Sequence, residues 1–275
     1  IEAMDIQKIC VCFDRKEPTF RHEQFSDYKG HRPPPPDDFI VQIPVLKELL
    51  TKLNVYQVEK AGFEADDLMG SMAKQFESNY NVFLFTNDHD ALQLVNDMTT
   101  VVFQKKNEFI YMNPKAVKEK YKLTTSQIID YKALKGDTSD NIPGVKGIGD
   151  KTAVNLLTQF GTLENIYQNI DNISSKSVQE KLRNSKDLAF LSQSLATIKC
   201  DIQVNCKDNE LRYNPDWTLG VEMFENLGFA RLIQQYGTKE AKNLNLKNNK
   251  PKEKVYQLIE TKNELIAILD QLQSG

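Results

Sequence analysis

Cysteine is scarce in this sequence, with four residues among 275. Cys10 and Cys12 lie in an apolar run without CxxC spacing or a nearby histidine, and Cys200 and Cys206 follow much later. Zinc sites and disulfide frameworks need cysteines at set spacings, so this pattern favours neither and leaves both as lesser alternatives. We interpret the four as buried or incidental thiols, which suits a reducing, cytoplasmic compartment.

Long hydrophobic runs are also missing. No segment is long and apolar enough to span a membrane, and no signal peptide is recognisable. Positive charge is not in excess, because the net charge is −3 at pH 7. A nucleic-acid partner would therefore have to meet a local basic patch. With 40% hydrophobic and 27% charged residues, the composition is typical of a soluble globular protein of one large or two modest domains.

The first part of the chain alternates short apolar runs with helical patterns. Strands are predicted at residues 8–13, 55–59, 81–86, 99–104 and 108–113, and helices at 37–53, 64–78 and 90–95. The runs at 8–13 and 81–86 are typical of buried strands. Strands separated by helices indicate βαβ units, so we predict an α/β domain over residues 1–112 with a mostly parallel central sheet.

From residue 113 the pattern becomes helical. Asn113 followed by Pro114 is typical of a helix start, and Gly136 of a helix end. Helices are predicted at 113–121, 124–136, 162–170, 177–198 and 216–236. The sequence thus predicts a helical subdomain over 113–237, a polar linker rich in lysine and asparagine over 238–254, and the first strand and helix of a further domain over 255–275.

Acidic side chains gather where the predicted strands end. Ligands bind beyond the carboxyl ends of parallel strands, so these acids are predicted to share one rim of the sheet. They would repel one another unless cations neutralised them, and ligands that are all carboxylates suit Mg²⁺ or Mn²⁺. We predict a site for two or more such ions, of the kind that hydrolyses phosphodiesters. Its residues are Asp14, Glu64, Asp66, Asp67, Asp88, Asp90, Asp137 and Asp140.

Each acidic group, taken alone, has a simpler interpretation. Acids at a helix N-terminus are favoured by its exposed N–H groups, which would account for residues 64–67 and 88–90. Asp14 alone would be a turn residue. The combination of four groups at one rim favours the metal site.

The stretch IPGVKGIGDKTA, residues 142–153, interleaves glycines with hydrophobic residues. Glycine turns bring backbone N–H groups close to a partner, and such groups at a helix start bind phosphate. The pattern matches the hairpin of a helix-hairpin-helix motif, which holds the DNA backbone without reading its bases. The alternative is an ordinary glycine-rich loop between packed helices. The predicted DNA contacts are Gly144, Val145, Lys146, Gly147, Ile148, Gly149, Lys151 and Thr152.

Residues 19–36 place basic and aromatic side chains before four prolines. Basic residues interleaved with aromatics suit single-stranded or frayed nucleic acid. A solvated loop is an equally good interpretation of this segment alone. The basic residues are Arg21, which we predict to contact DNA, Lys29 and Arg32; Tyr28 stands beside Lys29.

Four collinear strings resemble the 5′ nuclease domain of bacterial DNA polymerase I, within the flap endonuclease family. They are FDRKEPTFRHEQFSDYKGHRPPPP, GFEADD, TNDHDALQLV and DYKALKGDTSDNIPGVKGIGDKTA, and the resemblance runs from about residue 6 to 236. It implies a PIN-like fold followed by a helix-hairpin-helix motif, and it places the eight acids above on the family's metal site. It also implies that Lys29 and Arg32 hold the scissile phosphate, that Tyr28 stacks near a displaced nucleotide, and that hairpin carbonyls hold K⁺.

The resemblance implies a hydrolase that cuts DNA near 5′ ends or flaps during replication and repair. It further implies a monomer in the bacterial nucleoid, linked to polymerase domains. The family begins with a strand ending in a metal-site aspartate, which has no counterpart here, and position 1 is not methionine. We therefore expect an N-terminally truncated chain with weakened metal binding and reduced or no activity; the alternative is a fragment of a longer protein that is active. A module that binds branched DNA without cutting it stays open; an RNA-directed nuclease is disfavoured, because the glycine hairpin suits duplex DNA.

Overall fold

The computed structural model describes residues 6–106 and 108–238 of the chain. Contacts within the chain divide it into two compact units, residues 1–215 and 216–275. The predicted further domain at 255–275, and the predicted linker from residue 239 onward, lie outside the described residues. The predicted boundary between residues 112 and 113 stays a prediction.

Five short strands lie at the five predicted places. β1 (Cys10–Cys12) pairs in parallel with β2 (Tyr56–Val58). β3 (Val82–Phe85) pairs in parallel with β4 (Thr99–Lys105), which pairs antiparallel with β5 (Glu108–Met112). Two of the three pairings are parallel, as predicted. The strands nevertheless form two separate sheets instead of one, because no strand among the described residues pairs with both β1 and β3.

The prediction that residues 81–86 form a buried strand is wrong for one of its two faces. Successive side chains of a strand point to opposite faces of a sheet. Leu84 packs in the core, whereas Phe83 and Phe85 are 39% and 43% exposed. These two rings make edge-to-face contacts with Tyr111 and Phe109 of β5. Although the residues of β3 are all apolar, only one face of this strand is packed against the core, and the other face is exposed.

The helices of the α/β part are short, and several begin at the residues that carry the candidate site. They are α1 (Phe20–Gln24), α2 (Asp37–Ile40), α3 (Gln42–Lys52), α4 (Ala65–Phe76) and the 3₁₀-helix η1 (His89–Leu94). The single helix predicted at 37–53 is interrupted at Val41. Glu64 caps α4, and Asp88 caps η1 by accepting a hydrogen bond from the Asp90 N–H at 2.8 Å.

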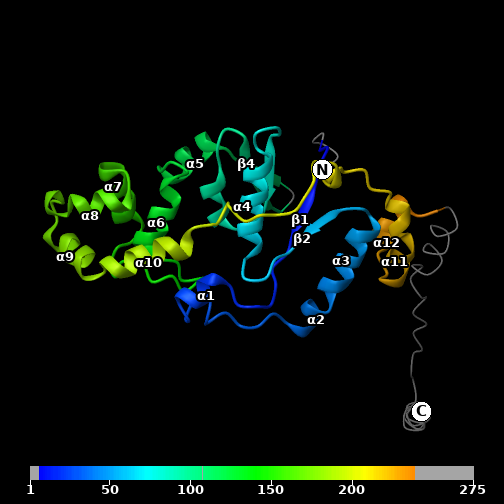
Figure 1. Cartoon of the computed structure of the whole chain (residues 1–275), viewed down its shortest axis with the longest axis horizontal. Helices are drawn as coiled ribbons and strands as arrows, with labels where there is room; N and C mark the ends of the chain where they lie inside the picture. Colours follow the sequence, from blue (N-terminus) through cyan, green and yellow to red (C-terminus); the bar gives the residue numbers. More distant parts are fainter. Residues whose placement is uncertain (1–5, 107, 239–275) are drawn as a thin grey trace, which may run out of the picture. The chain divides into compact units, whose positions relative to one another are not determined.

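The helical part is built from α5 (Pro114–Tyr121), α6 (Gln127–Lys135), α7 (Asp150–Phe160), α8 (Leu163–Gln168), η2 (Ile170–Asn172), α9 (Lys176–Asn184) and α10 (Lys186–Ala196), which Figure 1 shows in green to yellow. Asn113 caps α5 and Gly136 ends α6, as predicted. The single helix predicted at 177–198 is two helices that meet at Ser185. The core includes Leu134, Leu157 and Leu163.

Helix α6 joins the two parts of the first unit. It contacts α7 and α10 of the helical part and η1 of the α/β part. It therefore stands between the glycine hairpin, which precedes α7, and the acids of η1.

The chain then returns to the first strand through η3 (Asp208–Leu211), where the Ile9 N–H donates to the Leu211 carbonyl at 2.8 Å. In the second unit, η4 (Trp217–Gly220), α11 (Val221–Asn226) and α12 (Ala230–Tyr236) form a small helical group. Trp217 stacks on Tyr236 with ring centroids 4.8 Å apart, and Phe224 is fully buried.

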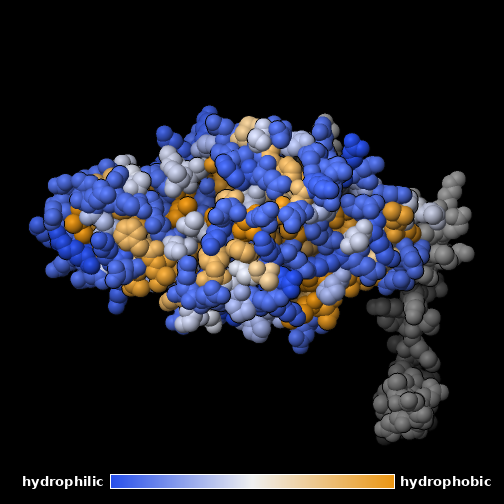
Figure 2. All heavy atoms as spheres, viewed as in Figure 1, coloured by the Kyte–Doolittle hydropathy of each residue, from blue (hydrophilic) through white to orange (hydrophobic). Residues whose placement is uncertain are grey.

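The face of the protein seen in Figure 2 is mostly hydrophilic, with hydrophobic atoms exposed in places, one of them over α10. Among the described residues, no helix has the length and apolar character needed to cross a membrane.

Candidate active site

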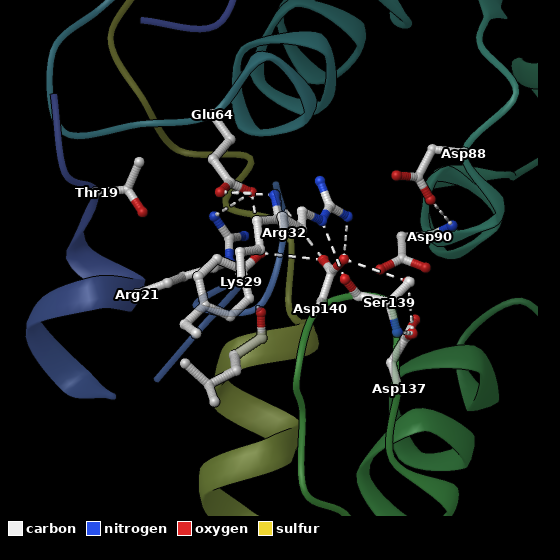
Figure 3. A network of polar contacts seen from close by, with 12 residues as sticks. Thr19, Arg21, Lys29, Arg32, Glu64, Asp88, Asp90, Asp137, Ser139 and Asp140 are labelled. Atoms are coloured by element: carbon white, nitrogen blue, oxygen red, sulfur yellow. Dashed lines mark hydrogen bonds and ion pairs between the residues drawn. The ribbon is translucent and has the colours of Figure 1, made fainter. Parts of the chain in front are cut away.

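The predicted acids meet basic side chains in one polar network. Figure 3 shows Glu64 and Asp140 around Lys29 and Arg32, with Asp137 beside Ser139 and with Asp88 and Asp90 on a neighbouring turn. The acids come from the start of α4, the start of η1 and the loop after α6. The topology therefore gathers the predicted site, although it does so from two sheets.

Glu64 is held at the N-terminus of α4 by its capping role, with its carboxylate turned toward the loop after α1. It accepts a hydrogen bond from Lys29 Nζ at 2.8 Å and one from the Tyr28 hydroxyl at 3.1 Å. Tyr28 also donates toward Asp140 at 3.2 Å. Two carboxylates from distant parts of the chain thus share one tyrosine.

Asp140 is buried and is held by basic groups on its other side. Its carboxylate pairs closely with Arg32, and Lys29 Nζ lies 3.9 Å away. The backbone fixes this arrangement, because the Lys29 N–H donates to the Asp140 carbonyl at 2.9 Å. Arg32 Nε donates to the Ser139 carbonyl at 3.0 Å. Lys29 and Arg32 therefore reach the predicted site, where they lie against its acids.

Asp90 and Asp137 share a third base, Lys132 of α6. Lys132 Nζ lies 2.5 Å from Asp137 Oδ2 and makes a close ion pair with Asp90 Oδ1. Ser139 donates to Asp137 through both its N–H and its hydroxyl. Burial raises the pKa of Asp137, but the hydrogen bonds from Lys132 and Ser139 outweigh it and lower that pKa to about 2.

Asp66 is different, because its carboxylate accepts no hydrogen bond and forms no ion pair within the described part of the chain. Burial, followed by the negative charges of Asp88 and Glu64, raises its pKa to about 7. Asp14 adds a smaller effect in the same direction and accepts a hydrogen bond from the Ala65 N–H at 2.8 Å. Asp14, Asp66 and Asp88 form the part of the site that lacks a basic partner.

Asp67 and Arg21 are paired with each other, and this pairing speaks against the predicted roles of Asp67 in the metal site and of Arg21 in DNA binding. Asp67 is fully buried, and Arg21 holds both of its oxygens in a bidentate pair at 2.7 and 2.8 Å. The same carboxylate accepts hydrogen bonds from the backbone N–H groups of Glu64 and Lys199. Arg21, 2% exposed, also donates to the carbonyls of Leu195 and Thr197. This pair ties α1 and α4 to the end of α10.

Tyr28 is also placed differently from the expectation. Its side chain is 3% exposed and packs in a small cluster with Ile142 and Leu195, so its ring has no free face for a nucleotide. Burial, and to a lesser extent the negative charges of Glu64 and Asp140, raise the pKa of its hydroxyl above the usual range. Tyr28 supports the acids in this arrangement.

The glycine hairpin divides into a buried and an exposed set. Val145 and Ile148 pack in the helical core, and the Gly144 N–H donates to the Ser192 hydroxyl at 2.9 Å. DNA contacts by these three residues stay a prediction, and only their backbone could make them. Lys146, Gly147, Gly149 and Lys151 are exposed, and Thr152 is half-buried. These residues lie at the start of α7.

Two basic residues of the site were missed from the sequence. Lys132 lies on α6, five positions before Asp137, and Lys181 of α9 donates to the Gly147 carbonyl at 3.1 Å. Lys132 has a recognisable signal, a lysine in the last turn of a helix that ends at an acidic loop. Lys181 has none, because it meets the hairpin only through the fold.

The residues around Glu64 and Lys29 border a cavity of about 350 Å³, which Asp14, His22 and Arg32 also line. Among the described residues, no three histidine, cysteine or acidic side chains form a ready-made group for a metal ion. Four of the site's acids, Glu64, Asp90, Asp137 and Asp140, are instead paired with Lys29, Arg32 and Lys132.

The chain is similar in sequence to curated DNA polymerases and similar in fold to solved 5′-nuclease structures. One curated relative, DNA polymerase I of Caldicellulosiruptor bescii, is 42% identical over 240 residues, which are 84% of this chain but 28% of that protein's length. A structure of bacteriophage T5 5′-exonuclease with bound divalent zinc has a TM-score of 0.62 at 21% identity, over 90% of this chain and 84% of that one. A complex of the T5 flap endonuclease with DNA and metal ions gives 0.59 at 22%, over 89% and 86%.

These structural likenesses show the fold, and the family models show the family. Residues 1–122 match the N-terminal, resolvase-like domain of 5′-3′ exonuclease, and residues 123–218 match its C-terminal SAM fold. The two matches are collinear and cover both the acids and the glycine hairpin. This chain belongs to the 5′-3′ exonuclease family.

Proposed function

We propose that this chain is the 5′ nuclease part of a bacterial DNA polymerase I and hydrolyses DNA phosphodiesters near 5′ ends or flaps. The observation that carries this proposal is Asp66. A carboxylate that has no hydrogen-bond or ion-pair partner among the described residues, and whose pKa is raised to about 7 by burial and neighbouring acids, is stabilised when a cation binds beside it. Ligands of this kind, all oxygen and all acidic, fit Mg²⁺ or Mn²⁺.

The seven remaining acids divide between two ion-binding regions. Asp14, Glu64, Asp66 and Asp88 would hold one ion, and Asp90, Asp137 and Asp140 would contribute to a second. When bound, such ions lower the pKa of a water molecule and stabilise the departing oxygen of a phosphodiester. Asp67 is excluded, because Arg21 and two backbone N–H groups take its oxygens.

Lys29 and Arg32 have two tasks in this proposal. Without DNA they neutralise Glu64 and Asp140. Both also border the cavity of about 350 Å³, so a phosphate that enters it meets two cationic side chains. Charge-assisted hydrogen bonds of this kind position a phosphate and offset its charge as the bond breaks.

The exposed half of the glycine hairpin would hold duplex DNA at a distance from the reacting phosphate. Gly149 and the first residues of α7 present backbone N–H groups at a helix start, with Lys146 and Lys151 beside them. K⁺ on the hairpin carbonyls belongs to the same proposal, and Lys181 already meets one of these carbonyls. A monomer in the bacterial cytoplasm, followed by polymerase domains, completes it.

A second candidate is a module that binds branched DNA without cutting it. It is favoured by one observation, that four of the seven remaining acids are paired with lysine or arginine. In this case the acids would serve to hold the fold.

The deciding experiment is cleavage of a 5′-flap duplex by this 275-residue chain in Mg²⁺ or Mn²⁺. We expect cleavage, and a loss of about 100-fold or more in Asp66→Asn, as for removal of a group that acts in the transition state. Asp97→Asn is the matched control, because it removes one exposed acid outside the network. Binding of the flap without cleavage would favour the second candidate.

A further inference from the structure

Lys132 is an internal cation in the acidic site. Its side chain is 14% exposed, and its two partners Asp90 and Asp137 are 13% and 18% exposed. Opposite charges at hydrogen-bonding distance attract strongly when water is largely excluded. The ammonium group of Lys132 therefore neutralises much of the charge that Asp90 and Asp137 could offer to another cation.

The site consists of two unlike halves. In the unpaired half, made by Asp14, Asp66 and Asp88, no basic side chain forms an ion pair within the described residues. In the paired half, made by Asp90, Asp137 and Lys132, a cation of the chain itself lies between the acids. In the first half, Lys29 pairs with the neighbouring Glu64, and its charge lowers the pKa of Asp66 without an ion pair to it. In the second half, a divalent ion must displace an ammonium group that is paired with both acids.

We propose that Lys132 is a built-in competitor that makes the paired half the weaker of two divalent-cation sites. This inference rests on the proposed metal-dependent function and names a residue that controls it. The unpaired half fills first, and the paired half fills only when the lysine gives up Asp90 and Asp137. The long, flexible lysine stem can turn away while α6 stays in place.

A purely structural role makes a different prediction. Lys132 joins α6 to the start of η1, and these two elements are in contact. If the lysine only held them together, its removal would loosen the site and weaken cation binding. If it competes, its removal strengthens binding at the paired half.

Titration of the whole chain with Mn²⁺, followed by electron paramagnetic resonance without DNA, separates these roles. Wild type is expected to show a tighter and a weaker class of site. In Lys132→Met the weaker class tightens by about tenfold or more, because a unit positive charge has left a partly buried site. Lys135→Met is the control, because it removes a lysine of the same helix that pairs with Asp150, at 2.9 Å, outside both halves.

Thermal melting gives a second readout. In EDTA, Lys132→Met is expected to have a lower melting temperature than wild type, since Asp90 and Asp137 lose their partner. On addition of Mn²⁺, its melting temperature is expected to rise by more than that of wild type. Lys132→Arg keeps the charge and is expected to bind Mn²⁺ as wild type does. If Lys132→Met does not fold, Lys132→Gln takes its place in both measurements.

Two results would overturn the inference in different ways. Unchanged or weaker Mn²⁺ binding in Lys132→Met, with binding in wild type, removes the role of Lys132 and leaves the metal site intact. An absence of Mn²⁺ binding in both proteins removes the proposed metal site as well.

Discussion

At the scale of single residues, neighbours in sequence have unlike roles. Asp66 and Asp67 stand side by side in the first turn of α4, yet one is unpaired at the site and the other is locked to Arg21. Successive residues of a helix point about 100° apart, so the string EADD predicts acids at the rim without telling which of them faces it. The fold makes this distinction, because Arg21 of α1, which also donates to the Leu195 carbonyl of α10, pairs with Asp67.

Arg21 gives the first prediction. Arg21→Ala is expected to lower the free energy of unfolding by about 3–5 kcal/mol, because it leaves the buried Asp67 carboxylate unpaired. Arg15→Ala is the control, an exposed arginine paired with Glu17, and is expected to cost far less, because water screens an exposed ion pair. Urea unfolding measures both. Equal losses in the two variants would contradict the structural role of Arg21.

Asp66 gives a prediction on pH. Its pKa in the folded chain is about 7, above the ordinary value of 3.8, so folding favours its protonated form. Its contribution to stability is therefore full below about pH 4 and is lost as the pH rises to about 7. In EDTA, Asp66→Asn is expected to be more stable than wild type at pH 8, by about 2 kcal/mol after allowance for partial solvent exposure, and equal to it at pH 4. Chemical denaturation of both proteins from pH 4 to pH 8 measures this difference. If the free energy of unfolding differs between them by the same amount at every pH, the raised pKa of Asp66 is contradicted.

At the scale of elements, the sequence predicted the strands and most helices but not how they associate. Strand positions follow from local alternation, whereas pairing depends on residues far apart, so the two-sheet arrangement was missed. The apolar run at β3 does not reveal that only one face is packed. Similarly, helical periodicity continues across Ser185, where the chain turns between α9 and α10.

The glycine hairpin carries the prediction at this scale. Gly144 has φ of 62°, and a methyl group on it would lie 2.3 Å from the Gly136 nitrogen. Gly144→Ala is therefore expected to destabilise the chain by about 2–4 kcal/mol. A methyl group on Gly149 meets open space, so Gly149→Ala is expected to change stability by less than about 0.5 kcal/mol. Thermal melts of both variants decide, and a larger loss in Gly149→Ala would contradict the division of the hairpin.

At the scale of the whole molecule, the net charge does not show where the acidic and basic side chains lie. The chain carries 35 basic and 38 acidic residues, so composition alone predicts no affinity for DNA. The structure nevertheless separates an acidic site, partly neutralised from within, from exposed lysines at the start of α7. Under the proposed function, attraction to DNA comes from such local patches, where lysines displace counterions from the phosphates.

This arrangement predicts how binding depends on salt. Changing both Lys146 and Lys151 to alanine is expected to weaken binding of a duplex similarly for all sequences and to reduce the slope of log affinity against log salt by about 2. The matched control changes Lys115 and Lys118, two exposed lysines of α5, and is expected to leave the slope within about 0.5 of wild type. Fluorescence anisotropy in EDTA, over a series of salt concentrations, measures both without cleavage. Because backbone contacts carry no base information, a loss confined to one DNA sequence would contradict the predicted role of the hairpin.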